Sequence, residues 1–359
     1  MAKRLRSGYT TGACAAAAAK AAVLTALTDA PPQSVELVFP DGTVHSFAVC
    51  RAHKNVDGAM ASVVKDAGDD PDVTNNAEIC AEVRFPTAAS ADTNVIVIKN
   101  IHLKAGAGVG RVTKPGLAVQ VGEPAINPVP REMICQAVRQ VEKNSIVEVT
   151  ISIPAGEELA RHTLNHRLGI EGGLSVLGTT GIVRPISAEA WTSTIEASMD
   201  VARAAGLSDI VLSTGRTSEK GVQQLLDLPE EAFAMMGDYL EFSLQAAAGR
   251  GFTVIHLAAM WAKIVKAAMQ IPQTHVRHGA LEMKDAAAML EGCGAAMPLL
   301  EQLRKSNTAR EMYGHLKEAG RADIIHKVCL MAQEYAENIS AGKVKVYLVD
   351  ASARVVEHV

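Results

Sequence analysis

A glycine-rich stretch at residues 165–187 carries the residue types that binding a large anionic ligand requires. It holds five glycines, two adjacent threonines and one carboxylate, Glu171, with an arginine toward each end. Glycine allows positive φ and close backbone approach, and the N–H groups of successive turns form concavities that bind anions. The residues expected to bind carboxylates here are Gly178, Thr179, Thr180, Gly181 and Arg184. A buried crossover loop between two domains is the alternative.

A second turn of this kind lies near the N-terminus, where Thr10, Thr11 and Gly12 precede an alanine-rich run. A threonine hydroxyl caps a first helical turn and alanine is the strongest helix former, so a helix is predicted to start at Thr10 or Thr11. Its first turn has no carboxylate, which favours an anion site, although capping alone is the alternative. We expect both turns to face one cleft. The charged groups expected there are Arg6, Arg184 and, toward the reacting region, Glu171.

A dense acidic turn at residues 68–72 is the third candidate. It places Asp69, Asp70 and Asp72 within four residues. Carboxylates at such density are expected to include at least one catalytic group, while a solvated turn is the alternative.

Long motifs in a fixed order carry a resemblance to a known family. They occupy residues 6–14, 65–74 (K-D-A-G-D-D-P-D-V-T), 106–117 (G-A-G-V-G-R-V-T-K-P-G-L), 121–131 (V-G-E-P-A-I-N-P-V-P-R) and 165–187. With these motifs the chain resembles, over essentially its whole length, the CbiD family. Its members are the cobalt-precorrin-5B C(1)-methyltransferases of the oxygen-independent cobalamin pathway. The resemblance implies S-adenosylmethionine as methyl donor and cobalt only within the substrate, a tetrapyrrole edged with acetate and propionate arms.

Such a substrate and donor define what the site needs. Carboxylate arms are bound by arginine forks and helix N-termini. The further cations available inside the motifs are Arg111, Lys114 and Arg131. Methyl transfer depends mainly on holding the two ligands in line, because this orientation raises their effective molarity and so accelerates the reaction. Neither a catalytic triad nor a protein-bound metal is therefore expected, and Asp69, Asp70, Asp72 and Glu171 are the carboxylates that could act near the reacting groups or the donor.

Composition sets the class of protein and its compartment. A chain of 359 residues exceeds the size at which one core usually keeps growing, so two domains are expected. No apolar run reaches the length of a membrane span, and the six cysteines include no C-x-x-C pair. These features favour a cytoplasmic protein with free thiols. Cys14 lies in the first turn of the predicted helix, where the pKa of its thiol would fall if that turn were exposed.

The pattern of elements predicts two different domains. Residues 1–187 mix strands and helices without regular alternation, which indicates an α+β domain. Four prolines (Pro115, Pro124, Pro128 and Pro130) are expected to hold an extended loop there. Residues 188–359 alternate strands and helices, which predicts an α/β, Rossmann-like domain with a parallel sheet. Helices are expected near Leu225 and over 232–248, and a last strand over 344–349.

The donor is expected in this second domain. Ligands of open parallel sheets lie beyond the carboxyl ends of the strands, and these ends are predicted at 213–216 and 256–259. The resemblance to the family implies two further donor-binding residues, Lys263 and His275. Around Lys263, however, the glycines of the family's motif are replaced by alanine or larger residues. The donor-binding residues expected are Ser213, Thr214, Gly215, Arg216, Lys263 and His275.

Two other functions fit parts of the sequence. The glycine-rich turns would suit a phosphoryl transferase, but no G-x-x-x-x-G-K-[ST] loop is present. A non-catalytic carrier of the tetrapyrrole is the other alternative. The net charge of −4 gives no basic footprint for nucleic acid. A corrinoid substrate, a possible homodimer and transient contacts with other pathway enzymes are the expected partners, and no membrane is expected.

Overall fold

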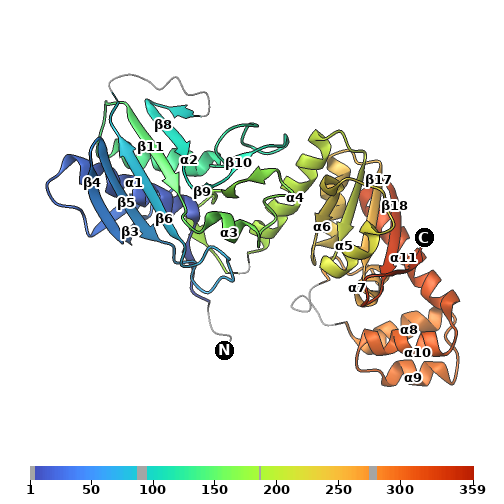
Figure 1. Ribbon diagram of the computed structural model, residues 1–359. Coiled ribbons are helices and arrows are strands. Elements are labelled where there is room, and N and C mark those ends of the chain that lie inside the picture. The colour runs from blue at the N-terminus through green and yellow to red at the C-terminus, as the bar shows by residue number, and fades with distance from the viewer. Residues whose placement is uncertain (1–4, 87–94, 186, 275–280) are drawn as a thin grey trace. The chain divides into compact units, whose positions relative to one another are not determined.

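The chain folds into two compact units, and each is described by itself. The structure is a computed structural model that describes residues 5–86, 95–185, 187–274 and 281–359. Unit 1 comprises Met1–Ala188 and unit 2 comprises Glu189–Val359. Figure 1 labels their helices and strands. Within the described ranges no helix is both long enough and apolar enough to cross a membrane.

Unit 1 is built on a six-stranded sheet of order β4-β5-β6-β11-β8-β7. Only β11 and β8 pair in parallel; the other neighbours are antiparallel. Its strands are β4 (Arg51–Asn55), β5 (Gly58–Val64), β6 (Glu78–Arg84), β7 (Ile96–Ile98), β8 (Ile101–Ala105) and β11 (Val147–Ser152). Helix α1 (Thr11–Leu27) packs against β5 and β6 and beside α2 (Pro128–Arg139) (Figure 1). Residues 13–19 of α1 are fully buried and almost all alanine, so the helix can lie close to its neighbours.

Strands β2 (Ser34–Val38) and β3 (Val44–Ala48) form a local antiparallel hairpin. Other short strands in unit 1 join segments that are far apart in the sequence. The antiparallel pairs among them are β1 (Gly8–Tyr9) with β14 (Ile182–Val183), and β10 (Arg111–Val112) with β12 (Ile170–Glu171). One pair is parallel, β9 (Gly108–Val109) with β13 (Gly173–Leu174). A short helix, α3 (Gly156–Ala160), follows β11. The 165–187 stretch is thereby paired with the N-terminus and with residues 108–112.

Three glycines of unit 1 make backbone-to-backbone contact at this junction. A Cβ on Gly108 would lie 1.9 Å from the carbonyl oxygen of Ile153. A Cβ on Gly156 or on Gly173 would lie 2.0 or 2.2 Å from the carbonyl oxygen of Gly108. No side chain fits at such distances, and Gly108 also has a positive φ of 72°. Within the 106–110 run, Gly108 is thus required by packing between β9, β13 and α3.

Unit 2 is a five-stranded sheet of order β16-β15-β17-β18-β19. The first four strands are parallel and β19 is an antiparallel edge strand. The strands are β15 (Asp209–Ser213), β16 (Phe233–Met235), β17 (Val254–Ala259), β18 (Lys343–Val349) and β19 (Val355–His358). Ile210 and Leu212 belong to one core cluster and Val211 to another. Such a continuous apolar run is typical of a strand that is buried on both faces.

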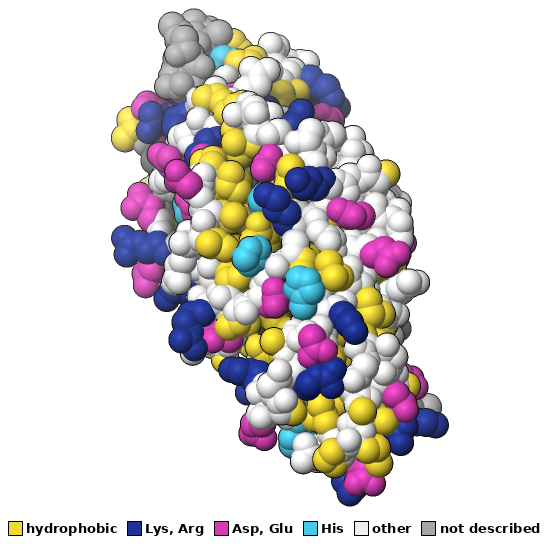
Figure 2. Space-filling model, turned by 90° about the vertical axis from the view of Figure 1, so that its right-hand side faces the viewer, with side chains coloured by type: hydrophobic (Ala, Val, Ile, Leu, Met, Phe, Trp, Pro, Cys, Tyr) yellow, Lys and Arg dark blue, Asp and Glu magenta, His cyan; other side chains and the backbone are white. Residues whose placement is uncertain are grey.

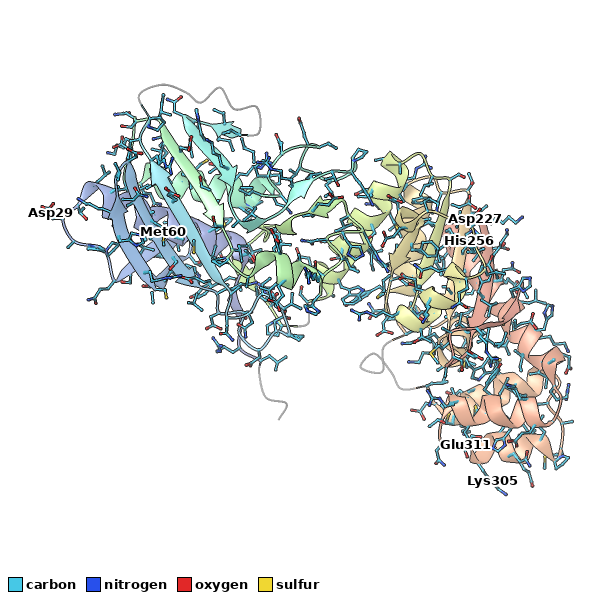
Figure 3. The ribbon with its side chains drawn as sticks, in the orientation of Figure 1. Asp29, Met60, Asp227, His256, Lys305 and Glu311 are labelled. Carbon is cyan, nitrogen blue, oxygen red and sulfur yellow. The ribbon has the colours of Figure 1, made fainter. Side chains whose placement is uncertain are left out.

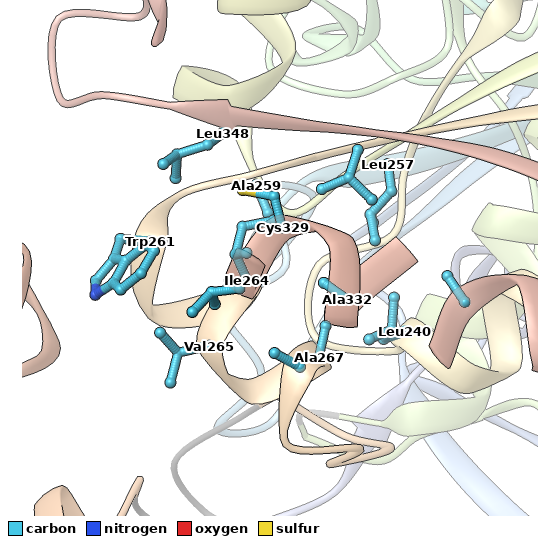
Figure 4. Packing of buried hydrophobic residues seen from close by; sticks show 14 of the residues in the cluster. Leu240, Leu257, Ala259, Trp261, Ile264, Val265, Ala267, Cys329, Ala332 and Leu348 are labelled. Carbon is cyan, nitrogen blue, oxygen red and sulfur yellow. The ribbon is translucent and has the colours of Figure 1, made fainter. Parts of the chain in front are cut away.

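Helices cover both faces of this sheet. The helices of unit 2 are α4 (Ala188–Ala204), α5 (Arg216–Gln223), α6 (Leu240–Gly249), α7 (Trp261–Ala268), α8 (Met283–Gly292), α9 (Leu299–Lys305), α10 (Ala309–Glu318) and α11 (Ala322–Ser340), with a 3-10 turn at Glu230–Ala232. Residues of α4, α6, α7 and α11 pack in the larger cluster, which Figure 4 shows around Ile264 and Ala332. Val222 of α5 packs on the opposite face with Val211. Helices α8, α9 and α10 pack on one another.

A buried polar group crosses the sheet of unit 2. His256 is 3% exposed, and its Nδ1 and Nε2 lie 2.9 Å from the Tyr347 hydroxyl and 3.2 Å from the Asp209 carboxylate (Figure 3 labels His256). Burial lowers the pKa of His256, although the bond to Asp209 opposes that shift. Asp209 is the first residue of β15, so this group lies away from the strand ends where ligands bind.

Several expected elements differ from the structure. Pro128 and Pro130 lie in the first turn of α2 and not in an extended loop, because proline fits the first helical positions. The helix expected near Leu225 lies earlier, at Arg216–Gln223. The helix expected over 232–248 is instead strand β16 followed by α6, and Gly237, with a φ of 58°, separates the two. The strand at 344–349 is followed by a further strand, β19.

The surface carries charges of both signs. Figure 2 shows one face, on which Lys and Arg side chains are interspersed with Asp, Glu and apolar side chains. This distribution fits a chain whose formal net charge is only −4.

The glycine contact predicts a large loss of stability on substitution. Gly108→Ala places a methyl group inside backbone atoms and strains a positive φ, so we expect the free energy of unfolding to fall by roughly 3 kcal/mol or more. Gly122→Ala is the matched control, because Gly122 has a φ of 89° but open space around its Cβ position; it should cost only about 1 kcal/mol. Urea unfolding followed by far-UV circular dichroism measures both. Equal losses would show that packing at Gly108 is unimportant.

Candidate functional site

A cavity of about 490 Å³ opens at the carboxyl ends of the parallel strands of unit 2. Its volume lies within the roughly 300–1,000 Å³ of small-molecule sites. Three strand ends line it, and two residues come from α10. The lining residues are Thr214, Gly215, Arg216, Thr217, Ser218, Met260, Trp261, Ala262, Lys263, Arg310, Tyr313, Leu348, Val349, Asp350 and Ala351. The fold therefore gathers segments from four parts of unit 2 at one site.

Two helix N-termini meet this cavity. Helix α5 begins at Arg216, directly after β15, and α7 begins at Trp261, directly after β17. Neither helix has a side-chain hydrogen bond at its N-cap. The first N–H groups of an uncapped helix carry partial positive charge and bind anions. Glu219 in the first turn of α5 opposes this effect, and its buried carboxylate accepts a hydrogen bond of 3.1 Å from the Ser213 hydroxyl.

The charged side chains of the cavity differ in how they are held. The Lys263 ammonium donates to the Asp238 carboxylate and, at 2.8 Å, to the Thr274 carbonyl oxygen. Asp350 accepts hydrogen bonds from the backbone and guanidinium of Arg354, which lower its pKa. Arg216 and Arg310 have no hydrogen-bond or ion-pair partner among the residues that the structure describes. The cavity thus offers two unpaired guanidinium groups.

The donor-binding residues expected from sequence are placed in three ways. Thr214, Gly215, Arg216 and Lys263 line the cavity. Ser213 is fully buried at the end of β15 and bonds to Glu219 beneath it. His275 lies outside the described residues.

The two candidate turns of unit 1 lie side by side. The N–H of Thr10 donates to the Gly181 carbonyl oxygen at 2.9 Å, and that of Gly12 donates to the Leu177 carbonyl oxygen at 3.0 Å. A Cβ on Gly178 would lie 2.4 Å from the Thr10 side chain. The two segments, more than 160 residues apart in the sequence, are therefore packed without space for a larger residue.

Protein groups satisfy much of the α1 N-terminus. The Thr10 hydroxyl caps the helix by accepting from the Ala13 N–H at 3.2 Å. Together with the Gly12 bond to Leu177, this leaves few first-turn N–H groups for an anion. Cys14 is fully buried, and burial raises the pKa of its thiol to about 12. The lowered pKa expected for an exposed first turn does not occur, because the turn is covered.

The acidic turn organises the chain around α1. Lys65 is only 2% exposed, and its ammonium donates to Asp72 and Thr74 and lies 3.4 Å from the Thr11 hydroxyl. Burial raises the pKa of Asp72, but the charge and hydrogen bonds of Lys65 outweigh it, so the net pKa is lowered. Asp69 accepts from the Arg6 N–H at 2.7 Å. Asp70 is half-buried at the same turn and has contacts of its own.

The candidate arginines of unit 1 differ in whether their guanidinium groups form hydrogen bonds or ion pairs with described residues. The Arg6 guanidinium is held in a two-point bond to Asp66, which raises its pKa. Arg131 donates to Glu123 at 2.8 Å and to the Ile126 carbonyl oxygen at 2.6 Å. Arg184 is exposed and has no such partner within the described part of the chain.

Arg111, Lys114 and Glu171 lie together around β10 and β12. Arg111 is paired with Glu171 across the two strands and donates to the Gly122 carbonyl oxygen at 3.1 Å. The Lys114 side chain lies against Gly169, where a Cβ would come within 2.4 Å of it. Glu171 is exposed, and one of its oxygens accepts from the Thr113 hydroxyl at 3.3 Å. Exposed Thr179 and Thr180 belong to the other turn, where the Thr180 hydroxyl accepts from the Ile182 N–H.

Sequence reasoning did not name eleven of the fifteen residues that line the cavity, and four of these bear on its chemistry. Trp261 and Asp350 directly follow strands β17 and β18, and the strand-end rule that selected Ser213–Arg216 applies to them as well. Arg310 and Tyr313 come from α10, and no local signal in the sequence connects that helix to the strand ends.

Comparisons with known proteins give matches to family models, to curated relatives and to one solved structure. The family model described as "CbiD" matches residues 1–185, and that described as "CbiD, C-terminal domain" matches residues 273–358. A cobalt-precorrin-5B C(1)-methyltransferase of Desulfotalea psychrophila is 55% identical over 99% of this chain and 98% of its own length. One of Geobacter metallireducens is 46% identical over 94% of each chain. The crystal structure of cobalamin biosynthesis protein (cbiD) from Archaeoglobus fulgidus matches with 24% identity and a TM-score of 0.40, covering 88% and 85% of the two chains.

The buried ion pair predicts the effect of Asp72→Asn. Removing one charge leaves Lys65 buried without a charge partner, so we expect the free energy of unfolding to fall by roughly 3 kcal/mol. Asp57→Asn at an exposed turn is the control and should change it by less than about 0.5 kcal/mol. Because the folded pKa of Asp72 lies below the ordinary 3.8, its stabilisation is complete above that pH and is lost as the pH falls through the folded pKa. Urea midpoints measured between pH 7 and pH 3 test this, and an unchanged midpoint at pH 7 would contradict it.

Proposed function

Because the chain belongs to the CbiD family, we propose that it transfers a methyl group from S-adenosylmethionine to C-1 of cobalt-precorrin-5B. The product is cobalt-precorrin-6A, an intermediate of anaerobic cobalamin biosynthesis, and the reaction takes place in the cytoplasm. Curated relatives that match nearly the full chain carry the name of this activity. The observation that carries the proposal is this match together with a ligand-sized cavity at the strand ends of unit 2.

The donor binds in the cavity of unit 2, which is a Rossmann-like α/β domain. The order of its parallel strands, with helices on both faces, supports this assignment. Thr214, Gly215 and Arg216 hold the nucleoside side of the donor, and Lys263 positions the segment at Thr274. A ligand that is partly apolar and partly anionic suits three features of the cavity: helix N-termini without a side-chain cap, apolar walls such as Leu348, and a buried indole N–H that has no partner among the described residues.

The corrinoid binds to unit 1. Its carboxylate arms are bound by Arg184 and by the turn at residues 178–181 beside Thr10–Gly12, with Arg111, Lys114 and Arg131 as further cations. Support comes from the packing of these turns on one another and from the absence of a partner for Arg184 among the described residues. Arg6 acts through its bond to Asp66, which holds the strand before α1.

The chain contributes binding, orientation and exclusion of water. S-adenosylmethionine supplies a methyl group on a positively charged sulfur when bound. The residues of each site fix their ligand, and effective molarity supplies most of the rate acceleration. Asp70, which is half-buried, and Glu171, which is exposed, orient polar groups near the reacting region, while Asp69 and Asp72 hold the acidic turn through Arg6 and Lys65. No residue needs to act as a nucleophile.

A direct assay tests the proposed function. The purified chain, incubated with cobalt-precorrin-5B and methyl-labelled S-adenosylmethionine, should give a product that carries one labelled methyl group at C-1, as mass spectrometry and NMR detect. Tight corrinoid binding without methyl transfer would identify a carrier instead. Hydrolysis of ATP without methyl transfer would favour a phosphoryl transferase.

Arg184→Ala tests the substrate site. Loss of a charge-assisted contact should raise KM for the corrinoid by about tenfold or more, while the affinity for S-adenosylhomocysteine stays unchanged. Lys54→Ala removes an exposed charge from β4 and serves as the control. Thermal melting must show that both variants are folded. Normal corrinoid kinetics in folded Arg184→Ala would exclude this site.

A further inference from the structure

The indole N–H of Trp261 is a buried donor without an acceptor. Trp261 is 5% exposed, and its Nε1 has no hydrogen-bond partner among the described residues. Figure 4 shows the indole with its nitrogen on the side away from Ala259 and Ile264. Buried indole N–H groups usually find a partner, because an unmade hydrogen bond costs free energy. Since Trp261 lines the cavity, its N–H marks a place where a bound ligand supplies an acceptor.

Arg310 brings a positive charge to the same wall of the cavity. It lies on α10 three residues before Tyr313, so the two side chains share one face of that helix. The Tyr313 ring contacts the Trp261 ring, with centroids 5.3 Å apart. The Arg310 guanidinium, which is exposed and lacks a partner among the described residues, therefore lies on the side of the cavity that Trp261 lines.

The chemistry of this wall suits a carboxylate. Helix α7 starts at Trp261 without a side-chain cap, so its first N–H groups add to the indole N–H. Asp350 is the acidic group among the described residues of the cavity lining, and the Arg354 guanidinium already neutralises it. Lys263 is occupied by Asp238. The wall thus presents donors and one unpaired positive charge, without a free carboxylate to repel an anion.

We propose that Trp261 and Arg310 form a carboxylate subsite that binds the α-carboxylate of the donor's amino-acid portion. The subsite rests on the proposed function, because that function places the donor in this cavity. The Arg310 guanidinium and the Trp261 N–H donate to the carboxylate oxygens, and the uncapped first turn of α7 adds its dipole. The peripheral carboxylates of the corrinoid have the same chemistry, so the test must separate the two sources.

Calorimetry with two nucleosides tests the subsite. The probes are S-adenosylhomocysteine and its decarboxylated analogue, which lacks only the carboxylate. Wild-type protein should bind the first about tenfold or more tightly than the second. Arg310→Gln should weaken S-adenosylhomocysteine binding by about tenfold or more and leave analogue binding within about twofold. Trp261→Phe should give a smaller loss with the same selectivity, because it removes one neutral donor.

Lys305→Gln is the matched control. It removes one positive charge from α9, at the end of the helix where Figure 3 labels Lys305. Lys305 is not among the residues that line the cavity. Both nucleosides should bind this variant as they bind the wild type. Arg310 is exposed, so its variant should fold, and an unchanged melting temperature verifies this.

Three results would overturn the subsite. Equal wild-type affinity for the two nucleosides means that the carboxylate is not bound. Equal losses for both in Arg310→Gln mean that Arg310 acts elsewhere on the ligand. If Arg310→Gln loses affinity for a polycarboxylate tetrapyrrole but binds S-adenosylhomocysteine normally, the wall binds the substrate and not the donor. If the wild type binds neither nucleoside, the donor site under the proposed function fails as well, which distinguishes that failure from the other three.

Discussion

The parallel pairing of β15, β17 and β18 is the constraint on which the candidate donor site depends. Parallel strands bring their carboxyl ends to one edge of a sheet, so residues 213–218, 259–263 and 348–351 meet although they are far apart in the sequence. Two of the three ends continue directly into helices, α5 and α7. Backbone donors are therefore collected at the cavity by topology alone, and the side chains of Arg216, Trp261 and Arg310 add to them.

Unit 1 depends on a different constraint, the close approach of glycine backbones. Gly108, Gly156 and Gly173 touch through main-chain atoms, and Gly178 packs on Thr10. These contacts hold residues 165–187 against segments near the N-terminus and residues 106–112. The buried Lys65 and Asp72 pair then fixes the acidic turn below α1. A glycine-rich sequence here makes a tightly packed junction, and the turn at residues 178–181 is part of it.

The sequence predicted elements well where the local signal was strong and poorly where packing decides. The helix predicted to start at Thr10 or Thr11 and the last strand, predicted over 344–349, are confirmed. Phe233–Met235 was read as helix, because a short buried apolar run does not distinguish a strand from a helix. Strand β19 was missed because it has only four residues, Val-Val-Glu-His, whose types show no alternation of apolar and polar side chains.

The residues of the candidate donor site likewise include some that could be predicted from the sequence and some that could not. Strand ends were predictable from topology, so Thr214, Gly215 and Arg216 could be named in advance as residues near one edge of the sheet, whereas Lys263 was named from the resemblance to the family. Arg310 could not, because only the packing of α10 near α7 brings it there. The glycine motifs were visible in the sequence, but their role in backbone contact required coordinates.

A crystal structure of the chain with S-adenosylhomocysteine tests the central claim, that unit 2 binds the donor at its strand ends. The account predicts density for the ligand in the cavity beside Thr214–Arg216, with its carboxylate within hydrogen-bond distance of Trp261 Nε1 and the Arg310 guanidinium. A nucleoside bound wholly within unit 1, away from those residues, would contradict it.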